Sequence, residues 1–444
     1  MKYMAKLKIS KKISTALINS LSAGVVPRFG LEHIAVGREK ELKSLLQNLD
    51  DIGEGVAAFR FIIGNYGSGK SFILQMIRNR AMEQNFVVAD ADLSSERRLA
   101  GTNNEGLATY RELMSRLATK TRPDGGALVS ILEGWINKIQ QEVAKDSGMR
   151  PNDEGFDDKV ETKIREVVQY IEDLVHGFDF GSVIVAYWRG YRLDDDDLKN
   201  AALRWLRGEF NTKTEAKAAL GVRVIIDDDS WYDYIKLIAK FVAEIGYKGL
   251  LVLLDEVVHI YQISTTVTRE KNYNRLLAMF NDTMQCKAEH LGIVVGGTTK
   301  FLEDPNRGLF ADPAWRRRTK ESRFVQAGVQ EYLGPVMRLN PLTEDEILML
   351  LQGLIEIHAL NFGYDKALTN RELKDFINEI VNRLGAEALL TPGEIVRDFI
   401  SVLNILYQNP EIYFSKLIHG SDFKLTAVGK NTDVDDDDAA EFSL

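Results

Sequence analysis

Short apolar runs in the sequence predict buried strands at four places, which are AFRFII at 58–63, NFVVADADL at 85–93, GLLVLLDE at 249–256 and LGIVVGGTTKF at 291–301. Strands of a parallel sheet are covered on both faces, so they contain continuous apolar runs rather than alternating apolar and polar residues. The runs therefore predict an α/β fold with a parallel sheet.

Apolar residues at helical spacing fill most of the remaining sequence. Helices are expected within 13–50, around an irregular connector that contains Pro27. A second helical region extends from about 105 to 245, and a third begins near LNPLTEDEILML at 339–350 and continues to YQ at 407–408. Trp188, Trp205 and Trp231 lie in the second region, where we expect core positions rather than a surface for stacking bases.

A glycine-rich loop separates the first strand from the following helix. GNYGSGKS at 64–71 fits the pattern G-x-x-x-x-G-K-[ST]. Backbone amides surround a phosphate only where side chains stay away, and a helix that begins near Lys70 directs its free N–H groups to the same place. The alternative is a glycine-rich turn without a ligand. The residues expected to bind nucleotide are Gly64, Asn65, Tyr66, Gly67, Ser68, Gly69, Lys70, Ser71 and Phe72.

Two carboxylates end the third apolar run. Lys70 would reach the β- and γ-phosphates and Ser71 would bind Mg²⁺. Ligands bind at the carboxyl ends of parallel strands, where Asp255 and Glu256 lie. Asp255 is expected to hold Mg²⁺, through water, and Glu256 to orient or deprotonate the attacking water. The alternative is a strand that ends in two solvated acids.

The spacing of these motifs requires an insertion. Lys70 and Asp255 are 185 positions apart. One intervening strand–helix pair needs about half that length or less, given βαβ units of ~30 residues. A helical insertion at about 105–245 must therefore lie between the second and third strands, where extra length costs little chain entropy and commonly serves partner binding.

The fourth run ends in Thr298 and Thr299. A polar residue at the end of the strand beside the acidic strand is placed to touch the γ-phosphate or the attacking water. The alternative is that these hydroxyls only form the turn that ends the strand.

Composition narrows the class of protein. The chain has 444 residues, 45% of them hydrophobic and 27% charged, which is ordinary for a globular protein. Cys286 is the one cysteine, so no internal disulfide is possible, and we expect a reducing compartment and a buried thiol. No apolar run approaches the ~18 residues of a membrane helix. The N-terminus lacks the apolar segment of a signal peptide, so a cytoplasmic location is expected.

Charge is uneven along the chain. The formal net charge is −9, which does not indicate nucleic-acid binding by itself. Basic residues gather at 1–12 and 315–323, and an acidic tail, TDVDDDDAAEFSL, occupies 432–444. These segments are expected to be solvated ends, and the alternative is a tail that competes with DNA for a basic surface.

Together the motifs resemble those of AAA+ ATPases of the origin-recognition and helicase-loader type, with a phosphate loop, a helical insertion and a helical lid. More narrowly, the sequence is similar to the BREX-system ATP-binding proteins of BrxD type, which belong to bacterial phage-defence islands. The glycine-rich loop and the acidic strand end are generic to P-loop NTPases, so they do not distinguish the BrxD type from other AAA+ ATPases. The more specific blocks are ALRWLRGE, WYDYIK, GYKGLLVLLDE, NYNRLLAMFND and PNRGLF.

The resemblance implies ATP and Mg²⁺ as cofactors and a homo-oligomer. Arg316, Arg317 and Arg318 lie where such ATPases carry an arginine finger, which would reach the ATP of a neighbouring copy, and the alternative is a basic surface turn. Arg397 would be a second sensor, or else a surface arginine. The sequence departs from the family in GGTTKF, which lacks an expected proline, and at Gly393, where an arginine is expected.

The resemblance also implies a function and a domain order. ATP hydrolysis would remodel DNA, or load or regulate a DNA-acting partner such as a helicase, in anti-phage defence. The alternatives are a nucleotide-dependent switch that binds a protein partner with little turnover, and a scaffold with a vestigial site. The expected parts are an N-terminal helical, basic arm at 1–35, an ATPase core at 36–335, a helical lid at 336–412 and an acidic tail at 425–444.

Overall fold

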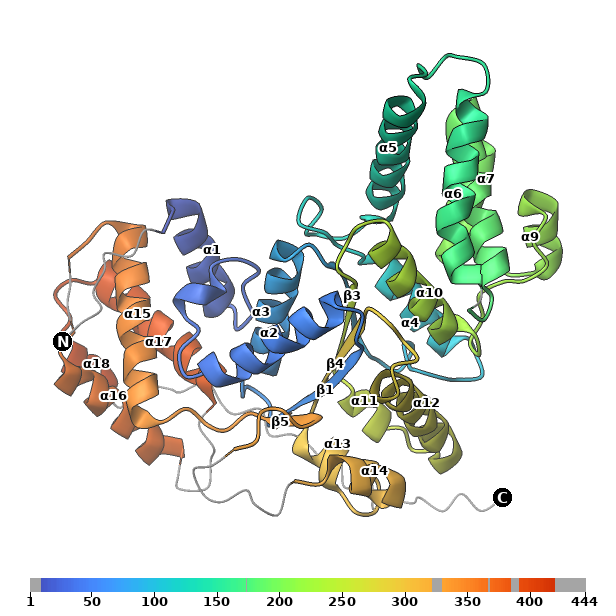
Figure 1. The fold of residues 1–444 in the computed structure, drawn as a ribbon. Helices are drawn as coiled ribbons and strands as arrows, with labels where there is room; N and C mark the ends of the chain where they lie inside the picture. The colour runs from blue at the N-terminus through green and yellow to red at the C-terminus, as the bar shows by residue number, and fades with distance from the viewer. Residues whose placement is uncertain (1–8, 173, 322–329, 366–367, 385–390, 420–444) are drawn as a thin grey trace, which may run out of the picture. The chain divides into compact units, whose positions relative to one another are not determined.

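The computed structural model describes residues 9–172, 174–321, 330–365, 368–384 and 391–419 (Figure 1). The chain forms two compact units. One contains Arg38–Asn340, and the other combines Met1–Gly37 with Pro341–Leu444. The acidic tail expected at 425–444 lies outside the described residues.

The larger unit is built on a five-stranded parallel sheet, which confirms the predicted α/β fold. The strands are β1 (Ala58–Ile63), β2 (Val87–Asp92), β3 (Leu250–Asp255), β4 (Leu291–Gly297) and β5 (Val336–Arg338). Their order across the sheet is β2-β3-β4-β1-β5. The sequence did not predict β5, a three-residue strand at the edge of the sheet beside β1.

Alternate residues of each strand face two separate apolar layers, as the period of a β-strand requires. Ile62 and Val88 face helices α2 (Glu39–Gly53) and α3 (Lys70–Glu83). Phe59, Phe61 and Val252 face the other layer. There Phe280 of α12 (Thr266–Met284) and Trp315 of α14 (Pro313–Thr319) complete an aromatic cluster with the two phenylalanines.

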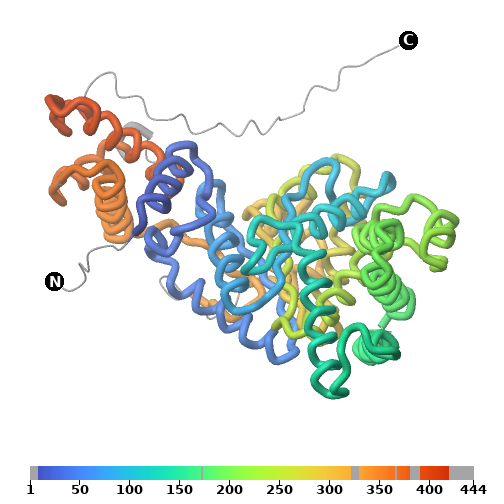
Figure 2. The backbone as a smooth tube through the Cα atoms, turned by 90° about the horizontal axis from the view of Figure 1, so that it is seen from above, coloured from blue at the N-terminus to red at the C-terminus, as the bar shows by residue number. Residues whose placement is uncertain are grey.

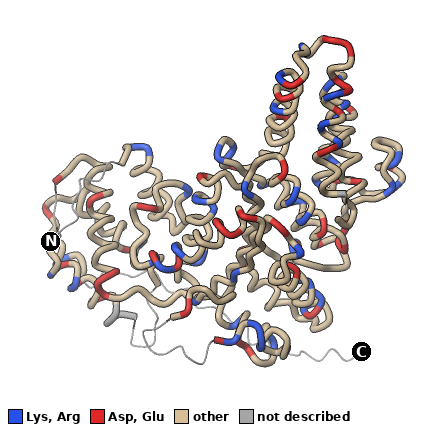
Figure 3. The backbone as a smooth tube through the Cα atoms, in the orientation of Figure 1, with Lys and Arg blue, Asp and Glu red and all other residues tan. Residues whose placement is uncertain are grey.

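Helices fill the long connection between β2 and β3. They are α4 (Glu105–Ser115), α5 (Leu128–Ser147), α6 (Phe156–Glu172), α7 (Gly177–Leu193), α8 (Asp196–Leu206), α9 (Lys213–Leu220) and α10 (Trp231–Glu244). Trp188, Trp205 and Trp231 are each 1% exposed, so the expected core positions are confirmed. Lys/Arg and Asp/Glu are interspersed along α5 and α6 (Figure 3), so the surfaces of these two helices carry mixed charge rather than one sign.

Short elements follow β3 and β4. They are α11 (Val258–Tyr261), α13 (Thr299–Glu303) and a 3₁₀ turn, η2 (Leu309–Ala311). The expectation of a buried cysteine is wrong. Cys286 is exposed, because it follows the last turn of α12 in a bend with a φ of 53°, beyond the packed face of that helix.

The smaller unit is helical. It contains α1 (Lys11–Ser22), η1 (Leu31–His33), α15 (Glu344–Phe362), α16 (Asn370–Leu384), α17 (Pro392–Gln408) and α18 (Phe414–Ile418). Helix α1 packs on α15 and α17, and it lies beside them in Figure 2. The hydroxyls of Ser14 and Thr15 donate to the buried Asn361 Oδ1 at 3.1 and 2.7 Å. The sequence analysis predicted a helical arm at 1–35, and α1 within that range packs against the C-terminal helices.

In the part of the chain that the structure describes, no helix is both long enough and apolar enough to span a bilayer.

Candidate nucleotide-binding site

The glycine-rich loop connects β1 to α3 at the carboxyl edge of the sheet, and α3 begins at Lys70. Gly67 and Gly69 have φ values of 71° and 95°, a backbone conformation that strains other residues. A Cβ on Gly64 would lie 2.4 Å from Ser68 Oγ. The Gly64 N–H donates to Gly297 O at 3.1 Å, so the end of β4 holds the start of the loop.

The ammonium of Lys70 lies inside this loop. Lys70 Nζ donates to Gly64 O at 3.0 Å and to Asn65 O at 2.9 Å, and it lies 5.3 Å from the centre of the Tyr66 ring. Burial lowers the pKa of Lys70, while the negative charges of Asp255 and Glu256 act in the opposite direction. The loop therefore holds a positive charge within an arc of backbone.

The structure brings Ser71 and Asp255 together, although 183 residues separate them. Ser71 Oγ donates to Asp255 Oδ2 at 2.7 Å. A serine hydroxyl that binds Mg²⁺ directly can donate its proton to a carboxylate that holds the metal through a water, so this pair fits an Mg²⁺ site. Among the described residues no group of three or more His, Cys, Asp or Glu is arranged to hold a metal. The pair would thus need phosphate oxygens or waters to complete the coordination.

Glu256 follows Asp255 in an unusual backbone conformation. Its φ is 56°, which is uncommon for a residue with a side chain and tends to occur at functional positions. Its N–H donates to Asp255 Oδ1 at 2.9 Å. Burial raises the pKa of Glu256, and the charge of Asp255 raises it further. Glu256 is therefore a stronger base than an exposed glutamate.

A third carboxylate, which the sequence analysis missed, lies at the same edge. Asp92 ends β2 and is the direct register partner of Asp255 on β3. Partial desolvation in the site raises the pKa of Asp92, and the charge of Asp255 adds to this effect. The sequence did contain a signal, because Asp92 is an acid at the end of the second predicted strand, and ligands bind at the carboxyl ends of parallel strands.

Thr298 begins α13 directly after β4. Its Oγ1 accepts a hydrogen bond from the Phe301 N–H at 3.2 Å, as a helix N-cap. Thr299 is the first residue of the helix and is exposed. The hydroxyl of Thr298 thus has a turn-forming contact, and contact with a phosphate stays a prediction.

Arg316, Arg317 and Arg318 are exposed on α14. Arg316 Nε donates to Phe310 O at 3.1 Å, and Arg318 Nη1 donates to Ala314 O at 2.9 Å. Among the described residues, none of the three has a hydrogen bond or ion pair with the glycine-rich loop of its own chain. Arg397 lies half-buried on α17, in the smaller unit.

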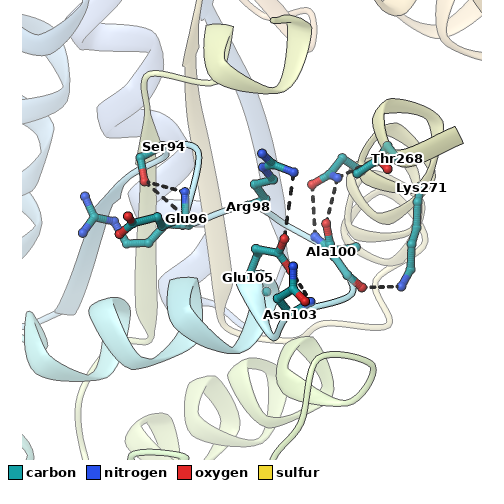
Figure 4. Close-up of polar contacts among 12 residues, drawn as sticks. Ser94, Glu96, Arg98, Ala100, Asn103, Glu105, Thr268 and Lys271 are labelled. Atoms are coloured by element: carbon teal, nitrogen blue, oxygen red, sulfur yellow. Dashed lines mark hydrogen bonds and ion pairs between the residues drawn. The ribbon is translucent and has the colours of Figure 1, made fainter. Parts of the chain in front are cut away.

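Hydrogen bonds join the connection between β2 and α4 to residues of α12 (Figure 4). The buried Asn272 of α12 accepts from the Leu99 and Ala100 N–H groups at 2.8 and 3.0 Å and donates to Ala100 O. Lys271 Nζ donates to Gly101 O at 2.9 Å. This anchoring, which the sequence analysis did not predict, fixes the segment that follows Asp92.

The parallel sheet, the glycine-rich loop and the acidic strand end define a P-loop nucleotide-binding protein. Residues 9–422 match the family described as BREX system ATP-binding protein BrxC/D, and the chain belongs to that family. The family description implies ATP binding and a part in anti-phage defence, and it confirms the predicted BREX resemblance. No curated protein matches the chain.

Proposed function

We propose that this protein hydrolyses ATP with Mg²⁺ at the site formed by the glycine-rich loop and the end of β3. The observation that carries the proposal is the hydrogen bond of 2.7 Å between Ser71 and Asp255, which joins the two parts of the site. A phosphate-binding turn alone would not need a contact between its serine and a carboxylate that is distant in the sequence.

The proposed binding mode uses the backbone and one cation. The N–H groups of Gly67 to Ser71 and the positive end of α3 favour a triphosphate. Lys70 would exchange its contacts with Gly64 O and Asn65 O for phosphate oxygens, which bind an ammonium more strongly than neutral carbonyls do.

Ser71 and Asp255 would hold Mg²⁺, Asp255 through a water molecule. When bound, the metal supplies positive charge that stabilises the phosphate oxygens in the transition state. Glu256 would orient the attacking water and accept its proton, a role that its raised pKa supports. Thr298 would report on the γ-phosphate from the adjacent strand.

The proposed assembly would bring an arginine of α14 to the ATP of a neighbouring copy. Arg316, Arg317 and Arg318 are exposed and have no bond to the loop of their own chain within the described residues. An AAA+-type homo-oligomer would place one of them against the ATP of the next copy, a contact worth ~10³–10⁵ in rate. Arg397 would act as the second sensor from the helical lid. Turnover would remodel DNA, or load or regulate a DNA-acting partner such as a helicase.

A second candidate is a nucleotide-dependent switch with little turnover. The observation that favours it is that, within the described residues, Arg316, Arg317 and Arg318 have no hydrogen bond or ion pair with the loop of their own chain. ATP would then shift the protein between two conformations that differ in affinity for a protein partner.

Steady-state ATP hydrolysis by the purified protein, alone and with single- or double-stranded DNA, distinguishes the candidates. Mg²⁺-dependent turnover that DNA stimulates is expected if the protein acts directly on DNA. Turnover indifferent to both DNA forms would point to a protein partner. Tight ATP binding without measurable turnover at any protein concentration would favour the switch and contradict the proposed hydrolysis.

A further inference from the structure

Helix α11 links Glu256 to the rest of the core and has little stability of its own. One helical turn contains few internal hydrogen bonds, and its last carbonyls have no partner within the helix. One side chain from another segment binds the carbonyl of the last residue of α11 and the two carbonyls that follow it. Arg307 Nε donates to Tyr261 O at 2.9 Å, and Arg307 Nη2 donates to Gln262 O and Ile263 O, both at 3.1 Å.

A second arginine strengthens the same end of the helix. The buried Arg269 of α12 donates from Nη1 to Ile263 O at 2.7 Å. Cations are favourable at the C-terminal end of a helix, and a planar guanidinium binds several carbonyls at once. Two cations thus hold the end of α11.

Arg307 is itself fixed by contacts with both neighbours. Asp304 Oδ1 accepts from the Asn306 and Arg307 N–H groups at 2.8 and 3.0 Å. Asp304 Oδ2 accepts from the Tyr261 hydroxyl at 2.8 Å, and the Tyr273 hydroxyl donates to Arg307 O at 2.9 Å. The turn at 304–307 and α11 are therefore joined in both directions: Tyr261 of α11 donates to Asp304, and Arg307 of the turn donates to Tyr261 O.

The glycine after this turn has a steric reason. A Cβ on Gly308 would lie 2.7 Å from Lys300 O and 2.9 Å from both Asp304 N and Asp304 O. These are backbone atoms, which cannot rotate away. The turn is consequently closed tightly against the last residues of α13, and its position is set by the end of β4.

We propose that Arg307 is a positioning residue for Glu256. Glu256 occupies an unfavourable backbone conformation, which persists only where the surroundings impose it. Two backbone bonds hold the bend itself: the Glu256 N–H donates to Asp255 Oδ1, and the Val257 N–H donates to Gly296 O. Downstream, Arg307 holds the far end of a helix only ~6 Å long, so its loss would let the bend relax. This inference rests on the proposed hydrolysis, in which Glu256 orients water.

The test uses three variants of the full chain and a matched control. Arg307→Gln removes the cation, Arg307→Lys keeps the charge without the planar fork, and Tyr261→Phe removes only the hydroxyl that meets Asp304. Arg275→Gln is the control, because Arg275 also donates to a backbone carbonyl, Asp229 O at 3.0 Å, away from α11. Two experiments are made: steady-state kinetics, which gives kcat and KM for ATP, and amide hydrogen exchange of residues 256–263.

We expect Arg307→Gln to lower kcat about 10- to 100-fold, as a small displacement of a reacting group does, with KM nearly unchanged. The kcat of Arg307→Lys should lie between those of Arg307→Gln and the wild type. Exchange in 256–263 should accelerate in Arg307→Gln and stay unchanged in Arg275→Gln. Added to Glu256→Gln, the substitution should cost nothing further, because residues that act as a unit are non-additive.

A wild-type kcat in Arg307→Gln, or unchanged exchange in 256–263, would overturn the inference. If Arg307→Gln does not fold, Tyr261→Phe decides, with an expected loss in kcat of about threefold or more from one missing hydrogen bond. If the wild type itself shows no turnover, the proposed hydrolysis fails, and the exchange measurement still decides whether Arg307 holds the 256–263 segment.

Discussion

At the scale of single residues, the candidate site depends on where a side chain is missing. Gly296 lies in β4, beside the acidic end of β3, and a Cβ there would lie 2.4 Å from Asp255 Oδ1 and 3.0 Å from Leu74 Cδ1. Its φ is not in the left-handed region, so space rather than backbone conformation explains the glycine. The absent side chain leaves room for the carboxylate that meets Ser71.

Gly296→Ala should therefore impair Mg²⁺-dependent turnover by displacing Asp255. Overpacking a core position by one methyl group costs about 1–3 kcal/mol of stability. The control is Gly292→Ala on the same strand, whose Cβ would meet the side-chain ends of Ile52 and Leu251 instead. We expect both variants to lose stability. The Mg²⁺ concentration that gives half-maximal turnover should rise only in Gly296→Ala, and an equal rise in both would contradict the assignment of Asp255.

Sequence could predict the residues of the site that belong to a local pattern. Lys70 and Ser71 follow from the spacing of the glycine-rich loop, and Asp255 from the end of an apolar strand. Arg307 and Asn272 could not be predicted, because their roles depend on backbone groups that are distant in sequence. Cys286 was misjudged, because residue type alone does not say that a helix has ended.

At the scale of elements, length decides what sequence can predict. The four longer strands are continuous apolar runs, and several helices begin at a threonine or aspartate N-cap, as at Thr343, Thr391 and Asp195. β5 has three residues and α11 has four, so neither is long enough for its apolar pattern to repeat recognisably. Their structure comes from β1 and from Arg307, respectively.

A buried histidine is expected to make the stability of two helices in the smaller unit depend on pH. His358 of α15 is fully buried, with Nδ1 2.7 Å from the Tyr364 hydroxyl and Nε2 3.0 Å from Asn404 Oδ1 of α17. Burial lowers the pKa of His358 below its ordinary 6.5, although the hydrogen bond to Asn404 opposes this. As pH falls through about 6.5, the unfolded chain binds a proton that the folded unit does not, so stability is lost.

Protection of α15 and α17 should thus weaken as pH falls below about 6.5, by at most about 1.4 kcal/mol per pH unit. Amide hydrogen exchange, corrected for the intrinsic pH dependence of exchange, measures the opening free energy of each helix. His358→Phe leaves Tyr364 and Asn404 without their partner, so it should lower protection at every pH but flatten the slope. An unchanged slope in that variant would assign the pH dependence to other groups.

At the scale of the whole molecule, the account requires a second copy. The arginines of α14 are exposed and, in the described residues, make no bond to the loop of their own chain. Sequence predicted the helical insertion, since 185 positions separate Lys70 from Asp255. It did not predict that α1 packs with α15 and α17, because contacts between distant ends of a chain leave no local pattern.

Mixing two inactive variants tests this requirement. Replacing Arg316, Arg317 and Arg318 with alanine should abolish turnover and spare ATP binding, because within the described residues these side chains have no hydrogen bond or ion pair with the loop of their own chain. Glu256→Gln keeps the arginines and lacks the proposed base. A mixture of the two should regain part of the wild-type turnover, since one copy donates an arginine to the intact site of the other. A mixture as inactive as its components would contradict an arginine acting between copies.

The proposed role of Glu256 in activating water is tested most directly by measuring both ATP affinity and ATP turnover in Glu256→Gln. The substitution keeps the shape of the side chain and removes its negative charge. The account predicts that ATP affinity stays close to that of the wild type and that turnover falls at least ~100-fold, as loss of the water-orienting base implies. Turnover equal to that of the wild type, with binding intact, would contradict the claim that Glu256 activates water at this site.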